Sequence, residues 1–138
     1  MSAVRQIENA LIVGGSVDWV HELGAVRIAA VRAQEARTFA AIRRRALEGV
    51  LVVVVQGNEV DERAIRARAS ESRVFIVWVD TAGVAVVGPT GQFLHRLRWA
   101  SGSSAQSVVR LDTRLAVDKR VTNDTDVLAN RRPATYAF

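Results

Sequence analysis

The stretch VLVVVVQG at residues 50–57 decides the fold. It contains six consecutive apolar residues, five of them β-branched valines, and a polar Gln56-Gly57-Asn58 sequence ends it. A run this short and this stiff predicts a strand that is buried on both faces. Two similar apolar runs, at residues 10–13 before Gly14 and at residues 74–79 before Asp80, predict its neighbours. Together the three runs indicate the middle of a small α/β sheet.

The segments between these runs have helical patterns. Residues 26–31 alternate apolar and polar side chains and predict a strand, although one helix over residues 17–47, interrupted only by a glycine, is the alternative reading. Three helices are expected, each from its caps and apolar stripe: residues 16–24 ended by Gly24, residues 34–47, and residues 59–70 begun by Asn58.

The last third of the chain has a different organisation. Residues 84–87 and 93–99 flank Gly88-Pro89-Thr90-Gly91 and predict an antiparallel hairpin, followed by a helix over residues 105–119. The order of elements predicts an α/β fold, a small doubly wound and mostly parallel sheet of the flavodoxin or Rossmann type with strand order 2-1-3-4. We expect one domain at residues 1–121 and an extended C-terminal arm at residues 122–138.

Composition narrows the environment and the partners. The chain has 138 residues, 49% of them hydrophobic, no cysteine and a net charge of +5 that comes almost entirely from arginine. Disulfides and thiolate metal sites are therefore excluded. No apolar run approaches the ~18 residues of a membrane span, and the N-terminal residues lack the order of a signal peptide, so a cytoplasmic location is expected. The positive charge favours an anionic partner, either nucleic acid or an acidic protein surface.

Residues 10–80 resemble the receiver domain of response regulators in the order and lengths of their elements. In that family an acidic pair ends the first strand and an aspartate that accepts phosphate ends the third. The matching positions here are Gly14-Gly15 and Gln56-Gly57. The resemblance therefore implies a degenerate receiver that binds partners without being phosphorylated. Val13-Gly14-Gly15 is also similar to the first turn of small Rossmann-type domains.

A candidate ligand site follows from the expected topology. In doubly wound sheets ligands bind at the carboxyl ends of the strands. That edge is expected to collect six small or polar residues: Gly14, Gly15, Ser16, Gln56, Asn58 and Asp80. The Gly14-Gly15-Ser16 turn either holds an anion or is a plain tight turn before a helix cap. The complete glycine-rich fingerprints of nucleotide-binding loops are absent.

The residues give no sign of catalysis or of a cofactor. His21 and His95 are the only histidines, neither has metal-ligand spacing, and no nucleophile can be paired with a base. No catalytic residue, metal or cofactor is therefore predicted.

The sequence leads to a binding function. We expect a non-enzymatic binding or regulatory module that acts through protein–protein contacts, assembles as a homo-oligomer and uses Trp99, Tyr136 and Phe138 at its interface. The alternative is a nucleic-acid-binding protein that uses five arginines: Arg43, Arg44, Arg45, Arg96 and Arg98. The third hypothesis is a phosphate or nucleotide binder at the Gly14-Gly15 turn.

Overall fold

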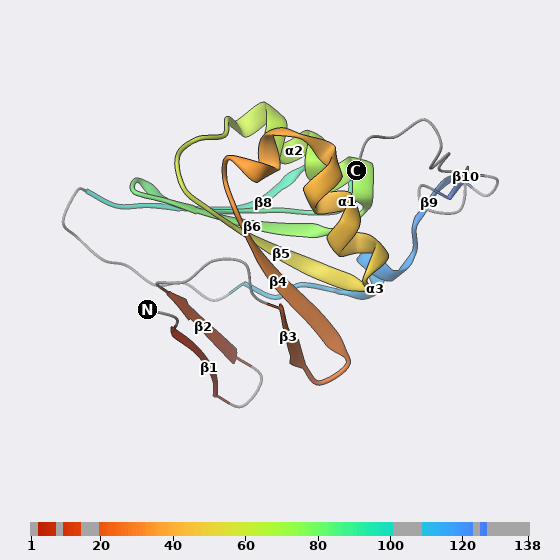
Figure 1. Cartoon of the computed structure of the whole chain (residues 1–138), viewed down its shortest axis with the longest axis horizontal. Helices are drawn as coiled ribbons and strands as arrows, with labels where there is room; N and C mark the ends of the chain where they lie inside the picture. The colour runs from red at the N-terminus through yellow and green to blue at the C-terminus, as the bar shows by residue number, and fades with distance from the viewer. Residues whose placement is uncertain (1–2, 8–9, 15–19, 101–108, 123–124, 127–138) are drawn as a thin grey trace.

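The protein has an α/β fold built on a mixed sheet of six strands (Figure 1). The computed structural model describes residues 3–7, 10–14, 20–100, 109–122 and 125–126. The sheet has the sequential order β3-β4-β5-β6-β7-β8. β4, β5 and β6 are parallel to one another, and the outer pairs are antiparallel. The strands are β3 Val20–Leu23, β4 Val26–Arg32, β5 Val50–Gln56, β6 Phe75–Asp80, β7 Gly83–Val87 and β8 Phe93–Arg98.

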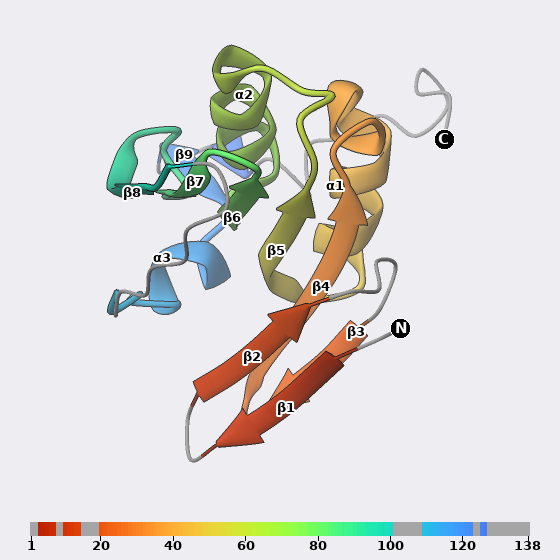
Figure 2. The ribbon, with the colours of Figure 1, turned by 90° about the vertical axis from the view of Figure 1, so that its left-hand side faces the viewer.

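The two longer helices cover the same face of this sheet (Figure 2). They are α1 Phe39–Leu47, preceded by the 3₁₀ turn η1 Glu35–Arg37, and α2 Glu62–Ser72. The opposite face is contacted by Ala116 of the short helix α3 Arg114–Val117. The α/β class is confirmed, but the doubly wound order 2-1-3-4 is wrong for the described strands. Both crossovers step in one direction across the sheet, and right-handed crossovers then place both helices on one side.

Two small antiparallel pairs lie outside the main sheet. β1 Ala3–Ile7 pairs with β2 Ala10–Gly14, and β9 Arg120–Thr122 pairs with β10 Thr125–Asp126. Residues 10–13 therefore form the expected strand, but it pairs with β1 instead of β5. Most of the predicted arm at residues 122–138 lies outside the described residues, so the division at residue 121 stays a prediction.

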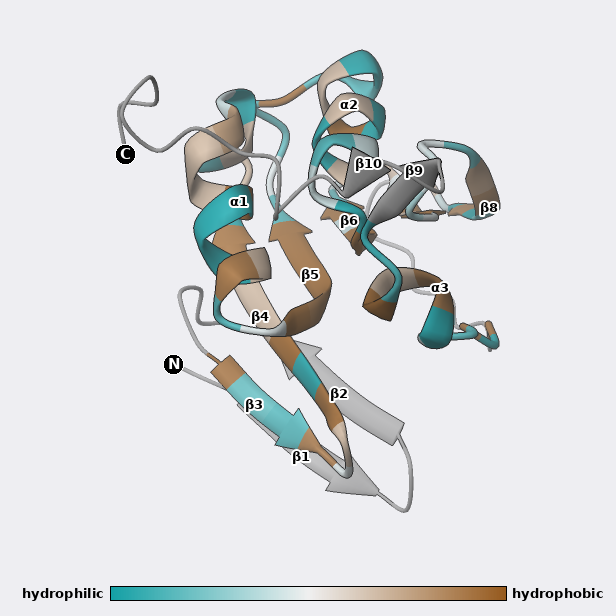
Figure 3. Ribbon diagram, turned by 90° about the vertical axis from the view of Figure 1, so that its right-hand side faces the viewer, coloured by the Kyte–Doolittle hydropathy of each residue, from teal (hydrophilic) through white to brown (hydrophobic). Residues whose placement is uncertain are grey.

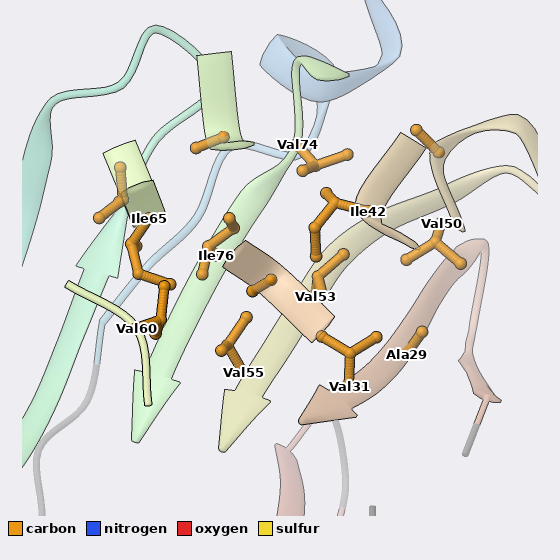
Figure 4. Packing of buried hydrophobic residues seen from close by; sticks show 14 of the residues in the cluster. Ala29, Val31, Ile42, Val50, Val53, Val55, Val60, Ile65, Val74 and Ile76 are labelled. Atoms are coloured by element: carbon orange, nitrogen blue, oxygen red, sulfur yellow. The ribbon is translucent and has the colours of Figure 1, made fainter. Parts of the chain in front are cut away.

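The core confirms the prediction that the apolar run at residues 50–57 forms a strand buried on both faces. Val53 and Val55 are fully buried under the helices with Ile42 of α1 and Ile65 of α2 (Figure 4). The alternate valines of β5 face the other way, where they pack with Phe75 and Ala116. Figure 3 shows β5 as hydrophobic along its length. A strand with both faces buried needs this unbroken apolar run.

The structure corrects four local predictions. Residues 20–23 form a strand and not a helix, because Gly24, with φ +62°, makes the turn of a hairpin with β4. The helix predicted over residues 34–47 breaks at Thr38, whose backbone is extended. The cap of α2 is Asp61 and not Asn58, since Asp61 Oδ1 accepts the Ala64 N–H at 2.8 Å. Within the described part of the predicted helix 105–119, only Arg114–Val117 is helical.

The strand over residues 26–31 and the hairpin are confirmed. A register shift within the hairpin pairs Phe93 with Val87 and His95 with Val86, so Leu94 is an extra residue in β8. This bulge brings Phe93 onto the same face as Arg96, which the simple alternation of the sequence does not predict. No helix among the described residues is long and apolar enough to cross a membrane.

Candidate functional site

Polar groups gather where the three parallel strands end. β4, β5 and β6 end at Arg32, Gln56 and Asp80, and parallel strands place these ends on one edge of the sheet. Just beyond the edge, Asn58 and Thr81 exchange two hydrogen bonds: Asn58 Nδ2 donates to Thr81 Oγ1 at 3.0 Å, and the Thr81 N–H donates to Asn58 Oδ1 at 3.1 Å. These bonds fix the loops that follow β5 and β6.

Asp80 holds the tight turn between β6 and β7 with one of its two carboxylate oxygens. Its Oδ1 accepts the backbone N–H groups of Ala82 at 2.8 Å and Gly83 at 3.0 Å. Among the described residues, no hydrogen bond to its Oδ2 is found. Asp80 is half-buried, so its position is fixed while one oxygen stays available to a ligand.

An open cleft of about 320 Å³ begins at this carboxylate. Its floor is the part of β7 around Gly83 and Ala85, on the same face of the sheet as the helices, and its walls are β6, β8 and the first residue of α2, Glu62. Of the three β7 residues that line the cleft, Gly83 and Ala85 are small, whereas the neighbouring strands contribute larger side chains. The cleft therefore exists because β7 has small residues at positions where the strands on either side have larger ones.

The pairing register arranges the cleft as two rows that cross three strands. The first row is Asp80–Gly83–Arg98, and the second is Trp78–Ala85–Arg96. At a strand spacing of about 4.8 Å, the outer members of each row lie roughly 10 Å apart at Cα.

The first row sets two opposite charges on either side of a glycine. No ion pair joins Asp80 to Arg98, and the Arg98 guanidinium has no hydrogen-bond partner in the described part of the chain. Gly83 has φ +156°, and a Cβ there would collide with the carbonyl oxygen of Leu97, so no larger residue fits without a shift of the backbone. The gap between the two charges is therefore built into the hairpin.

The second row is held by neighbouring groups. Trp78 Nε1 donates to the Gly57 carbonyl oxygen at 2.9 Å, which fixes the indole. The Arg96 guanidinium lies 4.4 Å from the centre of the Phe93 ring and forms an ion pair with Glu62. The charge of Arg96 is therefore already matched, unlike that of Arg98.

The residues predicted for the edge of the sheet come together only in part. Gln56, Asn58 and Asp80 lie at the carboxyl edge, as expected. Gly14 ends β2 in a separate sheet, so it does not share that edge by strand pairing. Gly15, Ser16, Tyr136 and Phe138 lie outside the described residues. Across the described ranges, no group of three His, Asp or Glu side chains is placed to hold a metal ion.

The arginines do not form one basic face. Arg43 is buried at 8% exposure, and its Nη2 donates to the Glu71 carbonyl oxygen at 2.7 Å. Arg45 forms an ion pair with Glu48 at 3.1 Å. Arg44 is exposed on the surface of α1. The predicted run of residues 43–45 is therefore split between structural and surface positions. Trp99 is half-buried, and its backbone N–H donates to the Ala82 carbonyl oxygen at 3.0 Å.

Sequence reasoning missed Glu62, Trp78 and Ala85. Each lines the cleft, but they come from three different elements. The available signal is the alternation of small residues in Gly83-Val84-Ala85, which leaves one face of a strand without bulk.

Solved structures with a similar fold include amidases. No protein-family model matches the chain, and no curated protein sequence matches it. The structure is similar to solved amidases of the nitrilase superfamily. One is a cysteine-to-alanine mutant of the amidase from Nesterenkonia AN1, with a TM-score of 0.52 and 23% identity over 66% of this chain and 41% of the amidase. A second structure of an amidase from Nesterenkonia sp. matches with the same TM-score and coverage at 22% identity.

These neighbours are larger and carry chemistry that is absent here. The chain spans about two fifths of the amidase. Other structures of that amidase contain butyramide, at a TM-score of 0.50, or a covalent adduct at its active-site cysteine. Our chain contains no cysteine. The likeness shows the fold, and it does not bring that nucleophile with it.

The likeness corrects the function expected from the sequence. The expectation of a non-enzymatic interaction module is wrong, because the matched fold is one on which amidases are built. The same finding corrects the expectation that the chain is not an enzyme, and it does not favour the nucleic-acid or Gly14-Gly15 alternatives. The resemblance of residues 10–80 to a receiver domain, and the identity of any partner chain, stay untested predictions.

Proposed function

We propose that the chain is an amide-hydrolysing enzyme, or the part of one that binds the amide, and that the carboxamide lies on the Asp80–Gly83–Arg98 row. The observation that carries this proposal is the unpaired carboxylate and guanidinium on either side of Gly83. The likeness to nitrilase-superfamily amidases supports the class of reaction.

A primary carboxamide complements both ends of this row. Its NH₂ group donates to Asp80 Oδ2, and its carbonyl oxygen accepts from the Arg98 guanidinium. Both hydrogen bonds involve a charged partner, and such bonds are shorter and stronger than neutral ones. The acid formed by hydrolysis offers Asp80 no donor when it is ionised and adds a like charge beside it, so the row favours the amide over its product.

Hydrolysis here would use water as the nucleophile, since the chain offers no thiol. Asp80 Oδ2 takes a proton from the water as the water oxygen bonds to the carbonyl carbon. Arg98 stabilises the negative charge that develops on the carbonyl oxygen. The proton then passes to the nitrogen as the C–N bond breaks, which releases ammonia and the carboxylic acid.

Binding of butyramide tests the site. Titrations of the wild type followed by NMR should show saturable binding, with butanoate at least about tenfold weaker, because one misplaced charge costs about 1.4 kcal/mol or more. Arg98→Gln should weaken butyramide binding by about tenfold or more. Arg44→Gln, an exposed arginine on α1, is the matched control and should bind as the wild type does.

Asp80→Asn completes the test. Asparagine keeps an oxygen for the turn N–H groups of Ala82 and Gly83, so the hairpin should persist. The variant cannot accept the proton from water, and ammonia release from butyramide should stop. Equal butyramide binding by Arg98→Gln, Arg44→Gln and wild type would refute the proposal.

A further inference from the structure

The second row of the cleft suggests how the bound molecule is selected. We infer that Trp78, Ala85 and Arg96 form the pocket for the acyl group of the amide, and that Ala85 sets the length of acyl group that fits. This inference rests on the proposed function, because the first row must hold the carboxamide for the second row to receive what is attached to it.

The position of the second row follows from the strands. Residues two apart on a strand point to the same face and lie about 7 Å apart, so Ala85 lies beside Gly83 on the floor of the cleft. A carboxamide held at the first row therefore directs its acyl chain either over Ala85 or out of the open end of the cleft. The chain over Ala85 is shielded from water on two sides, by the Trp78 indole and by Arg96.

The second row presents no unpaired charge. Arg96 is engaged by Glu62 and by the Phe93 ring, and Trp78 has its only donor occupied by Gly57. An acyl group with a carboxylate at its far end would approach Glu62 and find no free cation. The pocket therefore suits an uncharged, apolar acyl group.

Ala85 limits the depth of the pocket. It is buried at 6% exposure, and its methyl group projects from the same face of β7 as Gly83, which has no side chain. Valine at this position keeps the strand preference of β7 and projects two further methyl groups between Trp78 and Arg96. It leaves the first row unchanged.

A series of amides on the wild type tests the pocket without any substitution. Binding should strengthen from acetamide to butyramide by up to about fourfold per added methylene, the effect of burying each CH₂. Succinamate has a carboxylate in place of the terminal methyl group of butyramide. It should bind at least fivefold more weakly than butyramide. Affinities independent of chain length, or tighter binding of succinamate, would overturn the inference while leaving the proposed amide site intact.

The variant Ala85→Val then assigns the limit to its residue. Acetamide affinity should stay within twofold of the wild type, whereas butyramide and hexanamide should each weaken at least tenfold. Val77→Ile is the matched control, because Val77 packs on the opposite face of the neighbouring strand β6 and does not line the cleft, and its affinities should stay within twofold. Uniform weakening of all three amides by Ala85→Val, or no change, would contradict the role of Ala85. Failure of the wild type to bind any amide would refute the proposed function and this inference together.

Discussion

Replacing Lys119, the only lysine in the chain, should destabilise the protein substantially although the residue lies far along the sequence from its contacts. Its Nζ donates to the backbone carbonyl oxygens of Ser72 at 3.1 Å and Arg73 at 2.8 Å, where α2 ends. These carbonyls have no partner within the helix, and a cation at this end also interacts favourably with the helix dipole. Lys119 thus stabilises the end of α2 from a segment 46 residues further along the chain.

The magnitude follows from these two bonds. A hydrogen bond from a charged group contributes about 1.5–3 kcal/mol when buried. Lys119 is only half-buried, and water can replace it in part, so Lys119→Met should lower the free energy of unfolding by about 2 kcal/mol. Methionine keeps most of the apolar stem, which isolates the loss of the ammonium group.

Urea unfolding measures this change. With a slope of about 2 kcal/mol/M, the midpoint should fall by about 1 M. Arg110→Met removes an exposed cation from the same segment and should change stability by less than about 0.5 kcal/mol. Lys119→Arg should recover part of the loss. A Lys119→Met midpoint equal to that of Arg110→Met would refute the reasoning, since it would mean that the capping bonds contribute no net stability.

Three further predictions concern the helix cap, the core and one ion pair. Asp61→Ala should lower the free energy of unfolding, measured by urea titration, by about 1 kcal/mol, because Asp61 Oδ1 caps α2 by accepting the Ala64 N–H at 2.8 Å. Asp61→Asn should retain most of that stability. Val53→Ala, at a fully buried site, should lower the free energy of unfolding by about 2 kcal/mol. Val20→Ala, at 45% exposure, should lower it by less than about 0.5 kcal/mol, and equal losses would contradict the core as described. The hydrogen bond and positive charge of Arg114 hold the pKa of Asp112 below its ordinary value. The pair therefore contributes stability at a pH above the ordinary pKa of an aspartate, and this contribution is lost as the pH falls through the lowered pKa of Asp112. An NMR titration of the Asp112 carboxyl should show the low pKa, and Arg114→Gln should return it to the ordinary value; an unchanged titration would show that the pair does not form in solution.

The sequence predicts individual elements better than their arrangement. The valine run of β5 and the alternation of β4 are local patterns, and both strands were predicted correctly. Gly24 misled the prediction for residues 20–23, because the same positive φ serves a helix end and a hairpin turn. Strand order failed for a different reason: which strands lie next to each other depends on packing between distant segments, and no local pattern encodes it.

In the candidate site, too, local sequence patterns identified single residues but not how they lie relative to one another. Asp80 was singled out because it follows a buried strand, and it does lie at the cleft. Arg98 was noted as a basic residue and assigned to nucleic acid. Its relation to Asp80 depends on the β6–β7–β8 register, which fixes the Asp80–Gly83–Arg98 row only once the hairpin and its neighbour are paired. Glu62 reaches the cleft through the packing of α2, so no spacing in the sequence could place it there.

The most direct test of the central claim is an amide-resolved NMR titration of the wild type with butyramide. The account predicts the largest shifts at the backbone N–H groups of Ala82 and Gly83, which Asp80 Oδ1 accepts, and at the Arg98 guanidinium N–H groups. These shifts should be much smaller when butanoate is added at the same concentration, because butanoate is expected to bind at least about tenfold more weakly. No saturable shift at these three residues, or shifts of equal size with butanoate, would contradict the assignment of the cleft as a carboxamide site.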